Sequence, residues 1–324
     1  MRIVFLGSGT FGLPALGALV EEGQEVVLVV TQPDRPAGRG RTVTISPVKR
    51  FARDRDIPIS QPEDVNAPAA VRRIQRADPD LLLVIAYGQK LGPRLLGLAR
   101  HGAINLHGSL LPKYRGAAPV NWAIIRGETE TGLSVIAMTS EMDAGDILGQ
   151  RAAVIGPDET AGQLHDRLAD LGARLVMEVV RDLTLDEVGR RRQNETQATA
   201  APRLKKNDGL IRWDRPAREV YSHIRGMTPW PGAYTFLPAK PKQEPLRLVV
   251  TRAAMAGPAR AKEPPGTVVR ATAAGLDVAV ADGVVRLLEL TPAGKRTMSA
   301  ADFLHGHPVL PGTSLASGTW SAEA

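Results

Sequence analysis

Two polar side chains, Asn105 and His107, stand two positions apart in an apolar run that ends at a glycine-rich loop. Because side chains alternate along a strand, both would point to one face of a sheet, with Leu106 on the other. Ligands of open α/β sheets bind beyond the carboxyl ends of the strands, which is where this pair falls. A single such residue is more often structural than catalytic, and the pairing strengthens the catalytic interpretation.

A carboxylate that could orient His107 follows later in the chain. Asp143 and Asp146 both precede an apolar stretch, and the functional interpretation makes one of them the partner of the imidazole. In the alternative interpretation both are only turn or cap residues. The chain has no cysteine and six histidines without close paired spacing, so we expect no metal site.

The elements around these residues indicate an α/β fold. Helical patterns at 11–22, 47–55 and 161–181 accompany apolar runs that read as strands at 1–6, 25–31, 80–86, 103–107 and 133–138. Apolar strands that alternate with helices are typical of a parallel sheet covered on both faces. The sequence therefore predicts a doubly wound, Rossmann-like domain with a mostly parallel sheet.

The pattern changes after Lys205, where short strands follow one another without intervening helices. A helix is expected at 217–225, and Asp282-Gly283 indicates a hairpin. These features predict a small C-terminal OB-like β-barrel. The expected strands cover 246–254, 266–270, 276–281 and 284–290, and the expected divisions are a catalytic domain 1–189, a linker 190–206, a C-terminal domain 207–312 and a tail 313–324.

Charge is distributed unevenly along the chain. The net charge is +7, and residues 200–324 alone hold 17 Lys and Arg against 10 Asp and Glu. A basic module suggests a polyanionic partner, although a basic solvated surface is nearly as good an interpretation. No apolar run is long enough to cross a bilayer, and the N-terminus lacks the pattern of a signal peptide. We therefore expect a cytoplasmic protein without a membrane partner.

The segment 7–12 satisfies the G-x-G-x-x-G pattern of dinucleotide-binding turns, between a predicted strand and a predicted helix. The acidic residue that should end the second strand is missing, because that strand ends at Thr31-Gln32. A glycine turn that packs a strand closely on a helix explains the motif without a cofactor. We favour that interpretation and expect no NAD.

The chain resembles the methionyl-tRNA formyltransferases from about residue 1 to about residue 312. The central N-x-H-x-S-L-L-P and D-x-G-D motifs are similar to those of the wider folate-dependent formyltransferases. The Arg-rich loop and the C-terminal module narrow the resemblance to the tRNA enzymes. One departure is Gly7-Ser8-Gly9-Thr10, where the family usually has Gly-Thr-Pro. The matching stretches are 32–40, 46–49, 86–88, 105–112, 115–119, 142–146, Trp230-Pro231 and 292–295.

The resemblance implies transfer of a formyl group from 10-formyltetrahydrofolate to the amino group of methionyl initiator tRNA. Asn105 and His107 would then donate hydrogen bonds to the oxyanion that forms at the formyl carbon. Asp143 would favour the charged form of His107. Either His107, Asp143 or a water between them would move the protons.

The resemblance also implies two binding regions and a monomer. Folate is expected against Tyr87, Gly88, Ser109, Leu110, Leu111 and Pro112. The tRNA is expected on the glycine-rich loop and the basic module, through Arg35, Arg39, Arg41, Lys49, Lys205 and Lys206. Flexible glycines would let the arginines reach phosphates or an unpaired end. A disordered, solvated loop is the alternative.

Three other classes compete with this interpretation. A formyltransferase for a small amine, such as glycinamide ribonucleotide or a sugar nucleotide, should lack the Arg-rich loop and the basic module. A nucleotide-dependent dehydrogenase would bind nicotinamide. In a noncatalytic nucleic-acid-binding protein, the occurrence of Asn105, His107 and Asp143 in this pattern would be accidental.

Overall fold

The chain forms two compact units in a computed structural model that describes residues 1–37, 42–238, 244–256 and 263–316. Two of the residues predicted to bind tRNA, Arg39 and Arg41, lie outside the described residues, as does most of the predicted tail. The first unit comprises 1–119, 130–154 and 165–202, and the second comprises 120–129, 155–164 and 203–324.

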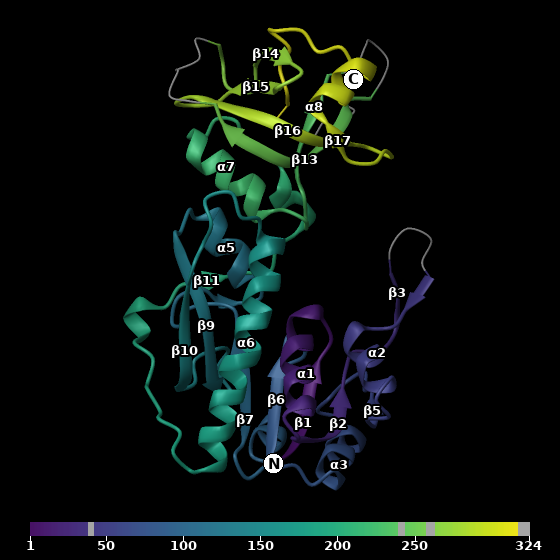
Figure 1. Cartoon of the computed structure of the whole chain (residues 1–324), viewed down its shortest axis with the longest axis vertical. Coiled ribbons are helices and arrows are strands. Elements are labelled where there is room, and N and C mark those ends of the chain that lie inside the picture. The colour runs from purple at the N-terminus through teal and green to yellow at the C-terminus, as the bar shows by residue number, and fades with distance from the viewer. Residues whose placement is uncertain (38–41, 239–243, 257–262, 317–324) are drawn as a thin grey trace. The chain divides into compact units, whose positions relative to one another are not determined.

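The first unit is built on a seven-stranded sheet (Figure 1). Its five strands from β5 to β7 are parallel, whereas β9 and β10 run antiparallel to their neighbours. The doubly wound, mostly parallel sheet is thus confirmed, and its last strands form an antiparallel edge. The order across the sheet is β10 (Ile147–Val154), β9 (Glu130–Ala137), β7 (Ala103–His107), β6 (Leu81–Ile85), β1 (Arg2–Gly7), β2 (Glu25–Val30) and β5 (Ile59–Ser60).

Helices cover both faces of this sheet. Helix α6 packs closely on the face that carries Leu106, because a Cβ added at Gly172 would lie 2.7 Å from Leu106 Cδ2. Asn105 and His107 therefore point to the opposite face, as their alternation predicts. The helices of this unit are α1 (Leu13–Glu21), α2 (Pro47–Arg53), α3 (Pro68–Arg76), α4 (Pro93–Leu96) and α6 (Ala161–Thr184), of which residues 161–164 belong to the second unit.

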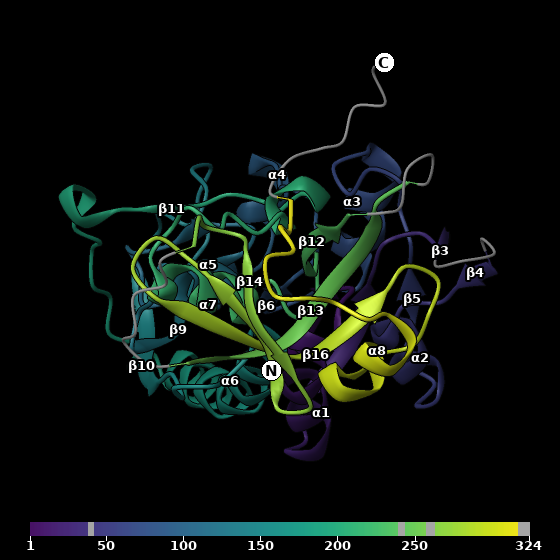
Figure 2. The ribbon, with the colours of Figure 1, turned by 90° about the horizontal axis from the view of Figure 1, so that it is seen from above.

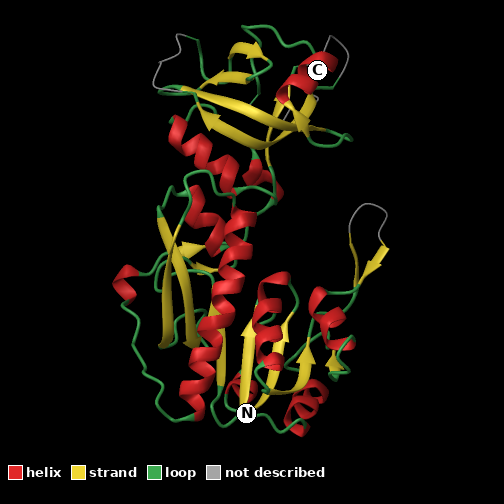
Figure 3. Cartoon of the chain, viewed as in Figure 1, coloured by secondary structure: helices red, strands yellow, loops and turns green. Residues whose placement is uncertain are grey.

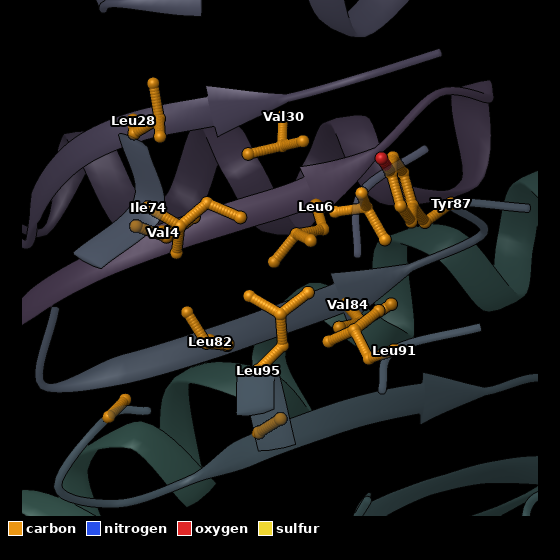
Figure 4. Packing of buried hydrophobic residues seen from close by; sticks show 13 residues of the cluster. Val4, Leu6, Leu28, Val30, Ile74, Leu82, Val84, Tyr87, Leu91 and Leu95 are labelled. Atoms are coloured by element: carbon orange, nitrogen blue, oxygen red, sulfur yellow. The ribbon is translucent and has the colours of Figure 1, made fainter. Parts of the chain in front are cut away.

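The face opposite α6 holds a hydrophobic core (Figure 4). Alternate residues of β1, β2 and β6 pack there against Ile74 of α3 and Leu95 of α4. Burial of this apolar surface is the main source of stability for such a sheet. The core fixes the position of β7 and of the residues that follow β6.

The glycine motif at the end of β1 serves packing. A Cβ added at Gly7 would lie 2.8 Å from the carbonyl oxygen of Ile85, and one at Gly12 would lie 2.9 Å from the ring of Phe5. Ser8 fills the turn, since its hydroxyl accepts a hydrogen bond of 3.0 Å from the backbone N–H of Gln32. These contacts agree with the structural interpretation of the motif.

The second unit carries an antiparallel sheet, with helix α7 against β13 (Figures 2 and 3). This confirms the predicted change to an antiparallel C-terminal domain. A four-residue turn, 280–283, joins β15 to β16, as Asp282-Gly283 predicts. Its elements are α5 (Pro119–Ile125), of which Pro119 belongs to the first unit, α7 (Ala217–Gly226), β12 (Ala233–Leu237), β13 (Leu246–Met255), β14 (Val268–Thr272), β15 (Gly275–Ala279), β16 (Val284–Pro292), β17 (Met298–Ser299) and α8 (Ala300–Gly306).

Acid should destabilise the second unit through His223 of α7. Its Nε2 atom is buried, and no group in the described part of the chain hydrogen-bonds it. Burial lowers the pKa of His223 below its ordinary 6.5. The unfolded chain therefore takes up a proton first as the pH falls, and stability is lost from about pH 6.5 downward.

This loss can be measured by urea unfolding followed by tryptophan fluorescence. The described tryptophans, Trp122, Trp213 and Trp230, all belong to the second unit. The wild type should lose more unfolding free energy between pH 8 and pH 5 than a His223→Leu variant. Equal losses would show that His223 does not couple stability to pH.

Candidate functional site

The imidazole of His107 is held at the end of β7. Its side chain is 6% exposed, and Nε2 lies 2.9 Å from the carbonyl oxygen of Tyr114. A carbonyl oxygen only accepts hydrogen bonds, so Nε2 must carry the hydrogen of this contact. The neutral ring therefore presents the lone pair of Nδ1, and only Nδ1 is left to exchange a proton.

Asp143 lies on the Nδ1 side of that ring. Its Oδ2 atom is 3.8 Å from Nδ1 of His107 and accepts a hydrogen bond of 2.9 Å from the backbone N–H of Gly116. The Asp143 side chain is only 14% exposed, so little solvent screens this pair. The Asp143 carboxylate therefore lies beside the one ring nitrogen of His107 that no described group engages in a hydrogen bond.

The backbone at Asp143 adopts an uncommon conformation. Its φ angle is +53°, in the left-handed region that costs residues other than glycine about 1 kcal/mol or more. The loop that connects β9 to β10, residues 138–146, must be held by other contacts to keep this geometry. Asp146, the other candidate from the sequence, makes no ion pair with His107 among the described residues.

The Asn105 side chain completes the group. It lies on the same face as His107 and is partly buried. Within the described part of the chain, no group hydrogen-bonds its side-chain amide. An amide without an internal partner is available to a ligand. The structure thus brings together the three residues predicted to be catalytic.

The residues predicted to contact folate include a tightly held loop, 109–112. The hydroxyl of Ser134 donates to the carbonyl oxygen of Ser109 at 2.7 Å and accepts from the N–H of Leu111 at 3.0 Å. The Leu111 side chain is buried in a small cluster with Ile136 and Ile147. Pro112 and Leu110 are partly buried. These contacts therefore hold the loop in one conformation, with much of its backbone already hydrogen-bonded.

Tyr87 and Gly88 follow β6. The Tyr87 ring belongs to the core of Figure 4, and its buried hydroxyl has no partner among the described residues. Burial, with a smaller effect of the Asp64 charge, raises the pKa of Tyr87 to about 12. Gly88 has a φ of +91°, which favours glycine. Tyr87 thus stays neutral and serves mainly as packing.

The described tRNA-binding candidates of the first unit lie at the base of a hairpin formed by β3 (Arg35–Ala37) and β4 (Thr42–Thr44). Arg35 pairs with Glu63 at 3.2 Å in an exposed contact. Lys49 forms an ion pair with Asp34, which also accepts a hydrogen bond from Gln61. The bond from Lys49, followed by that from Gln61, holds the pKa of Asp34 below its usual value.

The remaining two candidates, Lys205 and Lys206, belong to the second unit, and both are exposed. The backbone N–H of Lys205 donates to Asp208 Oδ2 at 2.6 Å at the start of the 3-10 helix Lys206–Gly209. Their side chains are thus placed on the surface of the module that carries the positive excess.

Several residues around the site were not predicted. The segment after Leu183, expected to be a linker, contributes Gln193, whose side-chain nitrogen donates to the carbonyl oxygens of Asp143 and Gly145, each at 2.8 Å. In the sequence, Gln193 is one polar residue within a polar run, and no periodicity distinguishes it from its neighbours. The other unpredicted residues are Arg115, Ser134, Gln150 and Thr199.

Family models match both parts of the chain. The formyl transferase model matches residues 1–180, and the model of the formyl transferase C-terminal domain matches residues 203–308. Among solved structures, HypX from Aquifex aeolicus in complex with tetrahydrofolic acid is 17% identical, with a TM-score of 0.64 over 94% of this chain and 47% of that chain. The sugar 3N-formyl transferase WlaRD is 15% identical, with a TM-score of 0.65 over 91% of this chain and 99% of that chain. At these identities the two structures show a shared fold.

Curated relatives are much closer in sequence. The methionyl-tRNA formyltransferase of Geobacter sulfurreducens is 45% identical over 97% of this chain and 96% of the relative. That of Pelotomaculum thermopropionicum is 43% identical over 97% of this chain and 98% of the relative. Identity of this degree over nearly the whole of both chains shows the family. The chain is a member of the methionyl-tRNA formyltransferase family.

Proposed function

We propose that the chain transfers the formyl group of 10-formyltetrahydrofolate to the amino group of methionyl initiator tRNA, at the group formed by Asn105, His107 and Asp143. The observation that carries the site is the distance of 3.8 Å between His107 Nδ1 and the Asp143 carboxylate. This pair accepts a proton, and the Asn105 amide beside it donates a hydrogen bond. Attack of an amine on a formyl carbon requires a group that accepts the amine proton and a donor that hydrogen-bonds the formyl oxygen.

The protons move through one atom of His107. The attacking methionyl amine gives its proton to Nδ1, because Nε2 is engaged with the carbonyl oxygen of Tyr114. The ring becomes positively charged, and the Asp143 carboxylate stabilises that charge. Nδ1 then returns the proton to the leaving nitrogen of the donor, so the ring ends neutral. One C–N bond forms, between the methionyl nitrogen and the formyl carbon, and one C–N bond breaks, between that carbon and the leaving nitrogen.

Negative charge collects on the formyl oxygen between these two proton transfers. The Asn105 amide donates to that oxygen, and the positive charge of the protonated His107 ring stabilises the negative charge. Donors fixed before the reaction need no reorganisation when the charge forms, and each contributes on the order of 2–4 kcal/mol to lowering the barrier.

The donor lies against residues 109–112 and 87–88 in this proposal. The hydrogen bonds from Ser134 hold that loop in one shape, so binding folate costs little ordering of the protein. The backbone groups of Gly88 and the second lone pairs of the loop carbonyls recognise polar edges of the pterin.

The glycine-rich loop and the basic module contact the tRNA. Replacing Arg39 and Arg41 together by alanine should weaken tRNA binding and flatten its dependence on salt. Each phosphate contact that is lost lowers the magnitude of the slope of log K against log salt by about 0.7–0.9. The slope of the double variant should therefore be smaller in magnitude by about one to two. Binding measured by fluorescence anisotropy at several salt concentrations gives this slope.

A matched control replaces Arg72 and Arg76 of α3, two exposed arginines of the same unit, by alanine. That variant should keep the wild-type slope. A slope that is unchanged in the Arg39→Ala, Arg41→Ala variant would count against the loop.

We further propose that the protein acts in the cytoplasm as a monomer, with residues 1–189 catalytic, 190–206 connecting, 207–312 binding tRNA and 313–324 a tail. No helix in the described ranges combines the length and apolarity that a bilayer crossing needs. Sedimentation at several protein concentrations tests the monomer, and a mass that rises with concentration would contradict it.

The acceptor is tested by competition. The protein is incubated with labelled 10-formyltetrahydrofolate and equal concentrations of methionyl initiator tRNA, glycinamide ribonucleotide and an amino-sugar nucleotide. The label should appear almost entirely on the tRNA. Label on either small amine in preference to tRNA would assign the chain to a different acceptor class.

A further inference from the structure

The segment 190–202 contacts both sides of the proposed catalytic group. It pairs with Ile147 through Arg191 and continues as β11 (Ala200–Ala201), which runs parallel to β8 (Arg115–Gly116). All these residues belong to the first compact unit. The segment therefore does more than connect two domains.

One side of the contact is the loop that holds His107 and Asp143 in place. Thr199 accepts at Oγ1 from the N–H of Tyr114 at 2.9 Å, and its carbonyl oxygen accepts from the N–H of Arg115 at 2.8 Å. The same loop supplies the Tyr114 carbonyl that fixes the hydrogen on His107 Nε2 and the Gly116 N–H that binds Asp143. Gly116 cannot be larger, because an added Cβ would lie 2.6 Å from the carbonyl oxygen of Ala201.

The other side is the backbone of Asp143 itself. Gln193 is 5% exposed, and its amide hydrogens go to the carbonyl oxygens of Asp143 and Gly145. Its amide oxygen accepts from Arg115 at 2.8 Å and 3.2 Å. A single side chain thus ties the loop of Asp143 to the loop of Gly116, with every hydrogen-bonding group of its amide in use.

We infer that Gln193 is a positioning residue for the formyl transfer, acting through Asp143. It holds the left-handed backbone of Asp143 so that the carboxylate faces His107 Nδ1. Misplacing a catalytic group by about 1 Å can cost on the order of a hundredfold in rate. This inference rests on the proposed function.

The test replaces Gln193 by glutamate, which has the same shape but cannot donate to the two carbonyl oxygens. The expected result is a kcat lower by roughly ten- to a hundredfold, with KM for folate and for tRNA within about threefold. Gln197→Glu is the matched control, because Gln197 lies in the same segment with an exposed side chain. It should behave as wild type.

A double-mutant cycle separates positioning from folding. Gln193→Glu should have little further effect in an Asp143→Asn background, because the group through which Gln193 acts is already lost. Gln193→Met, which is neutral, serves where the glutamate variant folds poorly, and it should also lower kcat and alter the pH profile of kcat/KM. Wild-type kcat and pH profile in the folded Gln193 variants, or fully additive losses in the cycle, would overturn the inference. Absence of formyl transfer by the wild type would instead contradict the proposed function.

Discussion

Asp143→Asn should nearly abolish formyl transfer, lowering kcat/KM by about 10²–10⁴-fold, while the fold survives. The asparagine side chain has the same shape, and its oxygen can still accept from the N–H of Gly116. What is lost is the negative charge 3.8 Å from His107 Nδ1, which stabilises the charged ring after it takes the proton. Steady-state formylation assays and thermal unfolding measure the two properties.

Asp146→Asn is the control for this prediction. Asp146 lies three positions further along the same loop, and the residue pattern left the two aspartates open until the family resemblance favoured Asp143. This variant should keep activity near that of the wild type. Wild-type kcat/KM in Asp143→Asn would remove Asp143 from the mechanism.

His107→Gln should lower kcat by about 10²–10⁴-fold with little change in stability. A glutamine amide nitrogen can occupy the place of Nε2 and donate to the carbonyl oxygen of Tyr114, so the buried contact at 2.9 Å is kept. Nothing replaces Nδ1, so the attacking amine has no group to receive its proton. Single-turnover formylation at saturating substrates measures this step apart from binding.

His101, in the turn before β7, provides the comparison. His101→Gln makes the same chemical change outside the proposed site and should leave the rate unaltered. If His107→Gln formylated methionyl-tRNA as fast as the wild type, proton transfer through Nδ1 would be excluded.

The sequence predicted the fold well where apolar patterns were strong. The strand at 103–107 was predicted with the bounds found, because it is a short, mostly apolar run that Gly102 and Gly108 flank. The direction of β9 was not predictable from its pattern, since a buried antiparallel strand at a sheet edge is as apolar as a parallel one. The strand β10 was missed because only part of it is buried.

The site was predictable only in part, for a physical reason. Asn105 and His107 share a strand, so their spacing fixes their common face. Asp143 reaches His107 through a loop whose course depends on Gln193, which lies 50 positions away in the chain. Contacts between such distant residues leave no local periodicity. The family resemblance favoured Asp143 over Asp146, whereas the distance of Asp143 from His107 and the part played by 190–202 needed the structure.

The most direct test is a single-turnover experiment with excess wild-type protein, 10-formyltetrahydrofolate labelled in its formyl group and methionyl initiator tRNA. Hydrolysis of the tRNA product should release labelled formylmethionine in an amount equal to the limiting tRNA. The variant with Asn105→Ala, His107→Gln and Asp143→Asn should bind both substrates and release almost none. Label that stays on folate with the wild type, or equal transfer by the triple variant, would contradict formyl transfer at this site.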